Sequence, residues 1–199
     1  MNARSEILSA IRARQVTSAP APPDYHAPTP ADLVQAFADH AQLANAEVRF
    51  IDSEADTPGT IADLLRARNF PAVVHVPPSC MSLPWHIAPG LTVEATSPGP
   101  DDAAMAIAPF GIAETGTLAY PSGTDSPASW HFCAGFEIAV LRAAAILPHM
   151  ENVIACFKAG GLPSTINFVT GPSRTGDIEQ TLELGAHGPK ALAILIVKD

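Results

Sequence analysis

Apolar positions along the chain follow two periodicities, which together predict alternating strands and helices. The clearest strand is ALAILIV at residues 191–197, whose near-continuous apolar character is typical of a central strand covered on both faces. A β-branched run, AVVHV, predicts another buried strand at residues 72–76. Further strands are predicted at residues 47–51, 91–95, 137–141 and 165–170, with two short strands around a tight loop in residues 104–120.

The segments between these strands have apolar residues at helical spacing and are predicted to be helices. Thr29 is expected to cap a first helix, with Pro30 at its first position, that continues to about residue 44. Pro58 is expected to open a second helix that turns Ile61, Leu64 and Leu65 inward. Two more helices are predicted at residues 150–158, ended by a Gly-Gly pair, and from about residue 176 to residue 184.

This alternation predicts an α/β fold in which a mostly parallel sheet is flanked by helices on both faces. Residues 31–199 are expected to form a single domain. Residues 1–30 are expected to be an appendage, because Ile7, Leu8 and Ile11 share one side of a short amphipathic helix and five prolines follow within residues 20–30.

Composition narrows the class of protein further. The chain has 47% hydrophobic and 16% charged residues, which is typical of a globular protein. Its formal net charge of −9 disfavours binding to nucleic acid or to anionic membrane surfaces. No apolar stretch approaches the ~18–20 residues that span a membrane, and the start lacks the features of a secretory signal. A cytoplasmic location is therefore expected.

No metal or cofactor site is predicted. Cys80, Cys133 and Cys156 are widely spaced, and no C-x-x-C or H-E-x-x-H pattern occurs. Phosphate-binding glycine motifs of the dinucleotide and P-loop types are also missing from the sequence. His131 and Cys133 invite a nucleophile–base interpretation, but it is disfavoured because no orienting partner is evident. His75, within a strand pattern, is interpreted as a core histidine.

The segment GIAETGT at residues 111–117 is the first place where chemistry is predicted. Glu114 is a carboxylate between apolar runs and is the candidate catalytic residue, since such a group either finds donors or has its pKa raised. Thr115, Gly116 and Thr117 are candidate ligand contacts. Alternatively, Glu114 closes the loop by hydrogen bonding to the backbone.

A second candidate cluster lies in GPSRTGDIE at residues 171–179. It follows a predicted strand and opens a predicted helix, where unpaired N–H groups favour an anion. A guanidinium can hold a carboxylate or phosphate there in a two-pronged contact. Simple helix capping explains the same residues equally well. The candidate anion-binding residues are Ser173, Arg174, Thr175, Asp177 and Glu179.

A third cluster, GAHGP at residues 185–189, contains His187, a secondary candidate that could transfer protons near neutral pH. Strand direction predicts that the second and third clusters lie at opposite ends of the sheet. Ligands gather beyond the carboxyl ends of strands, which favours the second cluster. We predict that Glu114 and Arg174 converge on a shared pocket.

Two stretches, GIAETGTLAYPSG at 111–123 and TGPSRTGDIEQTLELGAHGPKALAILIVKD at 170–199, resemble the lactate-utilisation protein C family, whose domain is also called the LUD domain. The resemblance implies a fold similar to ribose-phosphate isomerases and coenzyme A transferases, with an added antiparallel portion. It also implies a non-redox subunit that acts with iron–sulfur partner proteins in converting L-lactate to pyruvate, with a small carboxylate or phosphate as a possible ligand.

The chain departs from the family pattern after Ser122, where GTDSPASWHFCAGFE at residues 123–137 replaces an expected basic-rich loop. Two alternatives to the lactate role stay open. One is a stand-alone enzyme that acts on a phosphorylated or coenzyme A-linked small molecule with Glu114 as base or nucleophile. The other is a structural assembly module that docks through its N-terminal helix.

Overall fold

The computed structural model describes residues 3–14, 28–123, 127–176, 182–185 and 188–198. Its largest element is a six-stranded sheet in the order β1-β12-β7-β4-β2-β3, with parallel pairing throughout. This confirms the predicted α/β class and the interior position of the last strand. The strands are β1 (Glu47–Ile51), β2 (Val73–His75), β3 (Thr92–Glu94), β4 (Ala103–Ala108), β7 (Phe136–Arg142) and β12 (Ala191–Val197).

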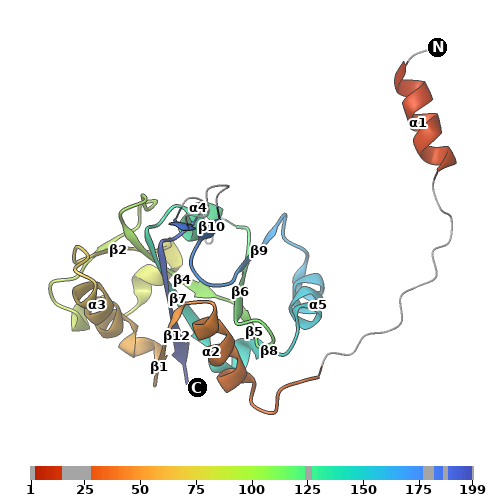
Figure 1. Cartoon of the computed structure of the whole chain (residues 1–199). Coiled ribbons are helices and arrows are strands. Elements are labelled where there is room, and N and C mark those ends of the chain that lie inside the picture. Colours follow the sequence, from red (N-terminus) through yellow and green to blue (C-terminus); the bar gives the residue numbers. More distant parts are fainter. Residues whose placement is uncertain (1–2, 15–27, 124–126, 177–181, 186–187, 199) are drawn as a thin grey trace.

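Both faces of this sheet are buried, because alternate side chains of β12 enter two different cores. Leu192 and Ile194 pack in a core that includes helix α2, whereas Ala193 and Leu195 pack in a core that includes helix α3. Figure 1 shows α3 on one side of the large sheet and α2 on the other. The two helices are α2 (Leu33–Leu43) and α3 (Thr57–Ala67).

A second, four-stranded sheet in the order β8-β5-β6-β9 shares the core of α2. Its β5–β6 and β6–β9 pairs are antiparallel, as the family resemblance implied, and β5–β8 is parallel. Helix α5 covers its outer face with Val153 and Phe157 (Figure 1). These elements are β5 (Phe110–Ile112), β6 (Thr117–Pro121), β8 (Ile146–Leu147), β9 (Ile166–Val169) and α5 (Met150–Gly160).

The prediction of a helix from about residue 176 to residue 184 is wrong at both ends of this segment, where the structure has strands. Strands β10 (Arg174–Gly176) and β11 (Leu182–Leu184) pair antiparallel there. Residues 177–181 lie outside the described part. The physical reason is tertiary, since antiparallel pairing satisfies the backbone groups that a helix would otherwise satisfy locally.

Two smaller corrections concern boundaries. Helix α2 begins later than predicted, because Asp32 and not Thr29 caps it, with its carboxylate accepting a hydrogen bond from the Gln35 N–H at 3.0 Å. The segment predicted as two strands contains three, β4, β5 and β6. The remaining short helices are α4 (Ala128–Phe132) and 3₁₀ turns at Glu54–Asp56, Pro78–Ser82, Trp85–Ile87 and Ala143–Ala145.

Helix α1 (Ala3–Ala13) has no buried residue, and Ile7, Leu8 and Ile11 are 60%, 40% and 57% exposed. The division into an N-terminal appendage and a single domain from residue 31 stays a prediction. Among the residues described, no helix is long and apolar enough to cross a membrane.

Candidate functional site

Glu114 lies in the turn between β5 and β6, and its backbone extends the pairing of β5 with β8. The Ala113 N–H donates to the Leu147 carbonyl at 2.8 Å, and the Glu114 N–H donates to the Pro148 carbonyl at 3.2 Å. Gly116 closes the turn with φ of +64°, where glycine is favoured, and its N–H donates to the Ile112 carbonyl. The turn therefore presents Glu114 to the residues that begin helix α5.

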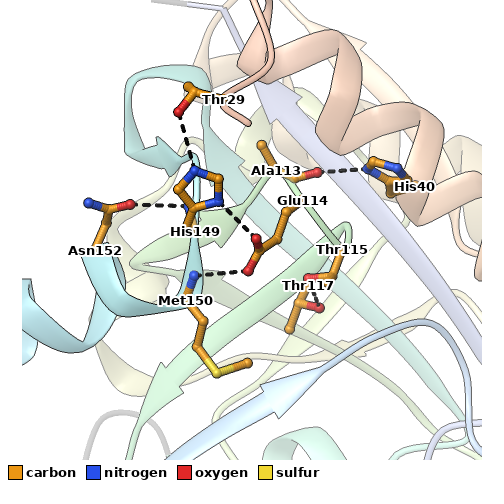
Figure 2. A network of polar contacts seen from close by, with 9 residues as sticks. All are labelled: Thr29, His40, Ala113, Glu114, Thr115, Thr117, His149, Met150 and Asn152. Carbon is orange, nitrogen blue, oxygen red and sulfur yellow. Dashed lines mark hydrogen bonds and ion pairs between the residues drawn. The ribbon is translucent and has the colours of Figure 1, made fainter. Parts of the chain in front are cut away.

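The carboxylate of Glu114 contacts His149, the residue that precedes α5 (Figure 2). Its Oε2 lies 2.8 Å from His149 Nδ1, and its Oε1 accepts a hydrogen bond from the Met150 N–H at 3.3 Å. On the far side of the ring, His149 Nε2 lies 3.2 Å from the Thr29 hydroxyl. Carboxylate, imidazole and hydroxyl thus form one continuous chain of contacts.

This arrangement suits proton transfer. A carboxylate on one imidazole nitrogen orients the ring and stabilises its protonated form, so the other nitrogen can take a proton from a hydroxyl. The His149 and Glu114 side chains are 16% and 30% exposed, so solvent and small molecules can reach them. The same contacts also cap α5, because Glu114 accepts a hydrogen bond from the Met150 N–H in the first turn, and the His149 N–H donates to the Asn152 amide oxygen.

Thr117 connects the first sequence motif to the strand that leads into the second. Its buried hydroxyl lies 2.7 Å from the Thr115 hydroxyl and 2.6 Å from the Thr170 hydroxyl. The nearby glycines pack on the end of helix α2: a Cβ on Gly116 would lie 2.2 Å from the Ala41 nitrogen, and one on Gly171 would lie 2.1 Å from the Ala44 oxygen. The two motifs are therefore anchored to one helix end.

The second and third predicted clusters lie together, which corrects the prediction that they occupy opposite ends of the sheet. The Ser173 N–H donates to the Pro189 carbonyl at 2.9 Å, and the Ser173 carbonyl accepts from the Gly185 N–H at 3.1 Å. The antiparallel pairing of β10 and β11 brings residue 185 back beside residue 173. The predicted helix would instead have carried the chain to the opposite end of the sheet. Residue 176, where the predicted helix would begin, belongs to strand β10, and the anion site stays a prediction.

Arg174 is exposed and lies in β10, where its backbone pairs with Leu184. Thr175 lies in the same strand, opposite Glu183. Among the described residues, no hydrogen bond or ion pair joins Glu114 to Arg174, and the shared pocket stays a prediction. The candidates Asp177, Glu179 and His187 lie outside the described residues.

Two functional features were missed in the sequence. His149 and Thr29 are far from Glu114 along the chain, and no spacing pattern connects them. His131 has the orienting partner that the sequence did not reveal, because its Nδ1 lies 3.0 Å from Glu137 Oε1 in the interior, whereas Cys133 is exposed. Within the described part of the chain, no three His, Cys, Asp or Glu side chains are placed to hold a metal ion.

Comparison with known proteins connects this geometry to a family. Residues 101–197 match the LUD domain. The chain is 35% identical over 100 residues to "Lactate utilization protein C" of Geobacillus kaustophilus, covering 48% of this chain and 42% of that protein. It is 37% identical over 93 residues to the protein of the same name from Bacillus subtilis, covering 44% of this chain and 39% of that protein. The matched segment thus spans about two fifths of the length of these curated relatives.

Other relatives carry no function in their names. An uncharacterised protein of Neisseria meningitidis is 33% identical over 98 residues, covering 48% of this chain and 42% of that protein. The crystal structure of a DUF162 family protein from Deinococcus radiodurans superposes with a TM-score of 0.61 at 22% identity, covering 84% of this chain and 97% of that one. That likeness shows a common fold, which includes most of the chain outside the matched domain.

Proposed function

Because residues 101–197 of this chain match the LUD domain, we propose that it serves in L-lactate utilisation as a subunit without a redox centre of its own. The observation that carries the proposal is the similarity to proteins named for lactate utilisation, at 32–39% identity. The three cysteines are not grouped as cluster ligands, which supports placing electron transfer in iron–sulfur partner proteins.

The Glu114–His149 pair is the part of the site that fits this chemistry best. Oxidation of a 2-hydroxy acid to a 2-oxo acid removes the hydroxyl proton together with the hydrogen on the same carbon and two electrons. His149 Nε2 already lies at hydrogen-bond distance from a hydroxyl, that of Thr29. In the proposed role, His149 accepts the proton of the substrate hydroxyl and Glu114 stabilises the resulting imidazolium, while the hydrogen on the carbon leaves with its electron pair, as a hydride, to a two-electron acceptor in the partner proteins.

Growth on L-lactate tests the proposal. In a strain of the source organism that has no second lactate-oxidising system, deletion of the gene should abolish growth on L-lactate, and the wild-type gene should restore it. Undiminished growth of the deletion strain on L-lactate would remove the lactate role. The acid–base role is tested by complementing with Glu114→Gln or His149→Asn, each of which should lower L-lactate-dependent dye reduction in extracts at least about tenfold.

Glu151→Gln is the matched control, because Glu151 is an exposed carboxylate in the first turn of the same helix. It should leave dye reduction unchanged. Equal activity of Glu114→Gln, His149→Asn and the control, at equal protein abundance, would remove the pair from the mechanism while leaving the lactate role intact.

A second candidate function, a structural assembly module, is favoured by one observation. Ile7, Leu8 and Ile11 expose an apolar side on α1, and an amphipathic helix of this kind is suited to dock on another surface. Light scattering on the full chain and on a chain without residues 1–28 separates this role from self-docking. Only removal of an assembly helix changes the number of chains per particle.

A further inference from the structure

A crevice opens at the carboxyl ends of strands β2 and β4, and its lining residues include neither Glu114 nor His149. These neighbouring strands send the chain in opposite directions: β2 leads outward to β3, whereas β4 leads toward β7 and β12. The two connections also lie on opposite faces. Residues after β2, such as Cys80 and Leu83, pack in the core of α3, whereas Leu118 and Tyr120 after β4 pack in the core of α2.

Such a divergence of connections is where open α/β sheets bind ligands, because the departing segments leave a gap above the strand ends. A pocket of about 340 Å³ occupies this position. Its walls come from the segment after β2 (residues 79–83), the end of β4 and the following residue (residues 107–109), and the end of β7. A smaller pocket of about 200 Å³ adjoins it and shares Ser79, Cys80, Ile107 and Pro109.

The chemistry of the walls indicates the class of ligand. Arg142, the last residue of β7, lines the pocket with a side chain that is 59% exposed. The exposed residues Ser79 and Ser82 add hydroxyls, and Leu83 and Ile107 add apolar surface. A guanidinium binds a carboxylate through paired hydrogen bonds, and the apolar surface suits a short carbon chain.

Glu54 holds Arg142 in place from the turn that follows β1. Both Arg142 Nε and Nη2 contact the same carboxylate oxygen, Glu54 Oε1, at 2.8 and 2.7 Å. An exposed ion pair contributes little stability, so a ligand carboxylate can share the guanidinium or displace Glu54 from it. Glu54 would therefore compete with an anionic ligand for the Arg142 guanidinium, and it also orients that guanidinium.

We propose that this crevice at the carboxyl ends of β2 and β4 binds a small carboxylate, with the ligand carboxylate on Arg142 and its carbon chain against Leu83 and Ile107. The inference is independent of the role in L-lactate utilisation, because it rests on the crevice and its side chains alone. It also differs from the Glu114 site in chemistry, since it offers a cation and hydroxyls in place of an acid–base pair.

Titration of the full chain with pyruvate, L-lactate and inorganic phosphate, followed by calorimetry and by amide NMR, tests this proposal. Pyruvate or L-lactate should bind saturably and shift the amide signals of residues 79–83 and 107–109. Arg142→Gln should weaken binding at least about tenfold, because a charge-assisted paired contact is lost. Glu54→Gln should strengthen binding, because the competing carboxylate is removed while the amide keeps the shape of the side chain.

Arg66→Gln is the matched control, since Arg66 also holds an exposed carboxylate, that of Asp63 at 2.7 Å, but on helix α3. It should leave the affinity unchanged. Failure of both carboxylates to shift the amide signals of residues 79–83 and 107–109 saturably would overturn the proposal, as would shifts of these signals that survive Arg142→Gln in a folded protein. Preferential binding of phosphate over both carboxylates would overturn the assigned ligand class.

Discussion

His131 and Glu137 meet in the protein interior with 3.0 Å between Nδ1 and Oε1, and their side chains are 0% and 1% exposed. The ring of Tyr120 stacks on the imidazole with centroids 3.7 Å apart. A buried His–Glu pair requires a compensating partner for each group, because either one alone would be a costly unpaired polar group. The pair therefore couples helix α4 to the start of strand β7.

Removing the carboxylate of this pair should destabilise the protein strongly. Glu137→Ala is expected to lower the free energy of unfolding by about 3–5 kcal/mol, because it removes the carboxylate that contacts the buried imidazole of His131. The double variant His131→Leu with Glu137→Leu should cost less than the sum of the two single Leu variants by at least about 1 kcal/mol. Urea unfolding of the wild type and these four variants measures both quantities, and strictly additive losses of the Leu variants would show that the two groups do not interact.

Tyr120 should make the protein less stable at alkaline pH. Burial, together with the negative charge of Glu137, raises the pKa of Tyr120 well above its usual value of 10.0. Above about pH 10 the unfolded chain loses this proton while the folded protein keeps it, so the stabilisation present below pH 10 is lost as the pH rises. Tyr120→Phe should flatten the fall in melting temperature above pH 10, and an unchanged slope would contradict the prediction.

Gly116→Ala is expected to destabilise the fold by more than about 2 kcal/mol or to prevent folding. Its backbone has a φ of +64°, and the added Cβ would lie 2.2 Å from a backbone nitrogen of α2, which cannot move as a side chain would. Gly59→Ala in helix α3 is the control, because a Cβ there meets nothing within 4 Å. The control should be neutral or slightly stabilising in a thermal melt, and equal behaviour of the two variants would refute the packing argument.

Glu47 should contribute stability that disappears in acid. Burial acts to raise the pKa of Glu47, but hydrogen bonds from Arg68 and Arg49 outweigh it and hold the pKa below its usual value of 4.5. The folded state therefore favours the ionised form, and its stabilisation is present above pH 4.5 and lost as the pH falls through the folded pKa. The stability difference between wild type and Glu47→Gln should shrink from pH 6 to pH 3, and a constant difference would contradict this assignment.

Residues 1–14 should contribute nothing to the stability of the main domain, because α1 has no buried residue. A chain that begins at residue 15 should unfold at the same temperature and urea concentration as the full chain. A lower melting temperature of the shortened chain would show that α1 docks on its own domain and that the predicted division of the chain is wrong.

The sequence by itself determined the class of fold. The period of apolar residues predicted strands β1, β9 and β12 and helices α3 and α5 close to their observed positions, because each element buries a face whose spacing is fixed by its own geometry. The motif at residues 111–117 also located the turn that carries Glu114. These features depend on local spacing, which is present in the sequence before folding.

Tertiary structure alone decided the partners of the candidate sites. His149 reaches Glu114 across 35 residues, and Glu54 reaches Arg142 across 88, through strand pairings that no local pattern specifies. The hairpin of β10 and β11 replaced a predicted helix for the same reason, since its backbone groups bond across strands and not along one segment. A side chain's type sets which chemistry it can perform, but only the folding of distant strands into one sheet determines which groups it meets.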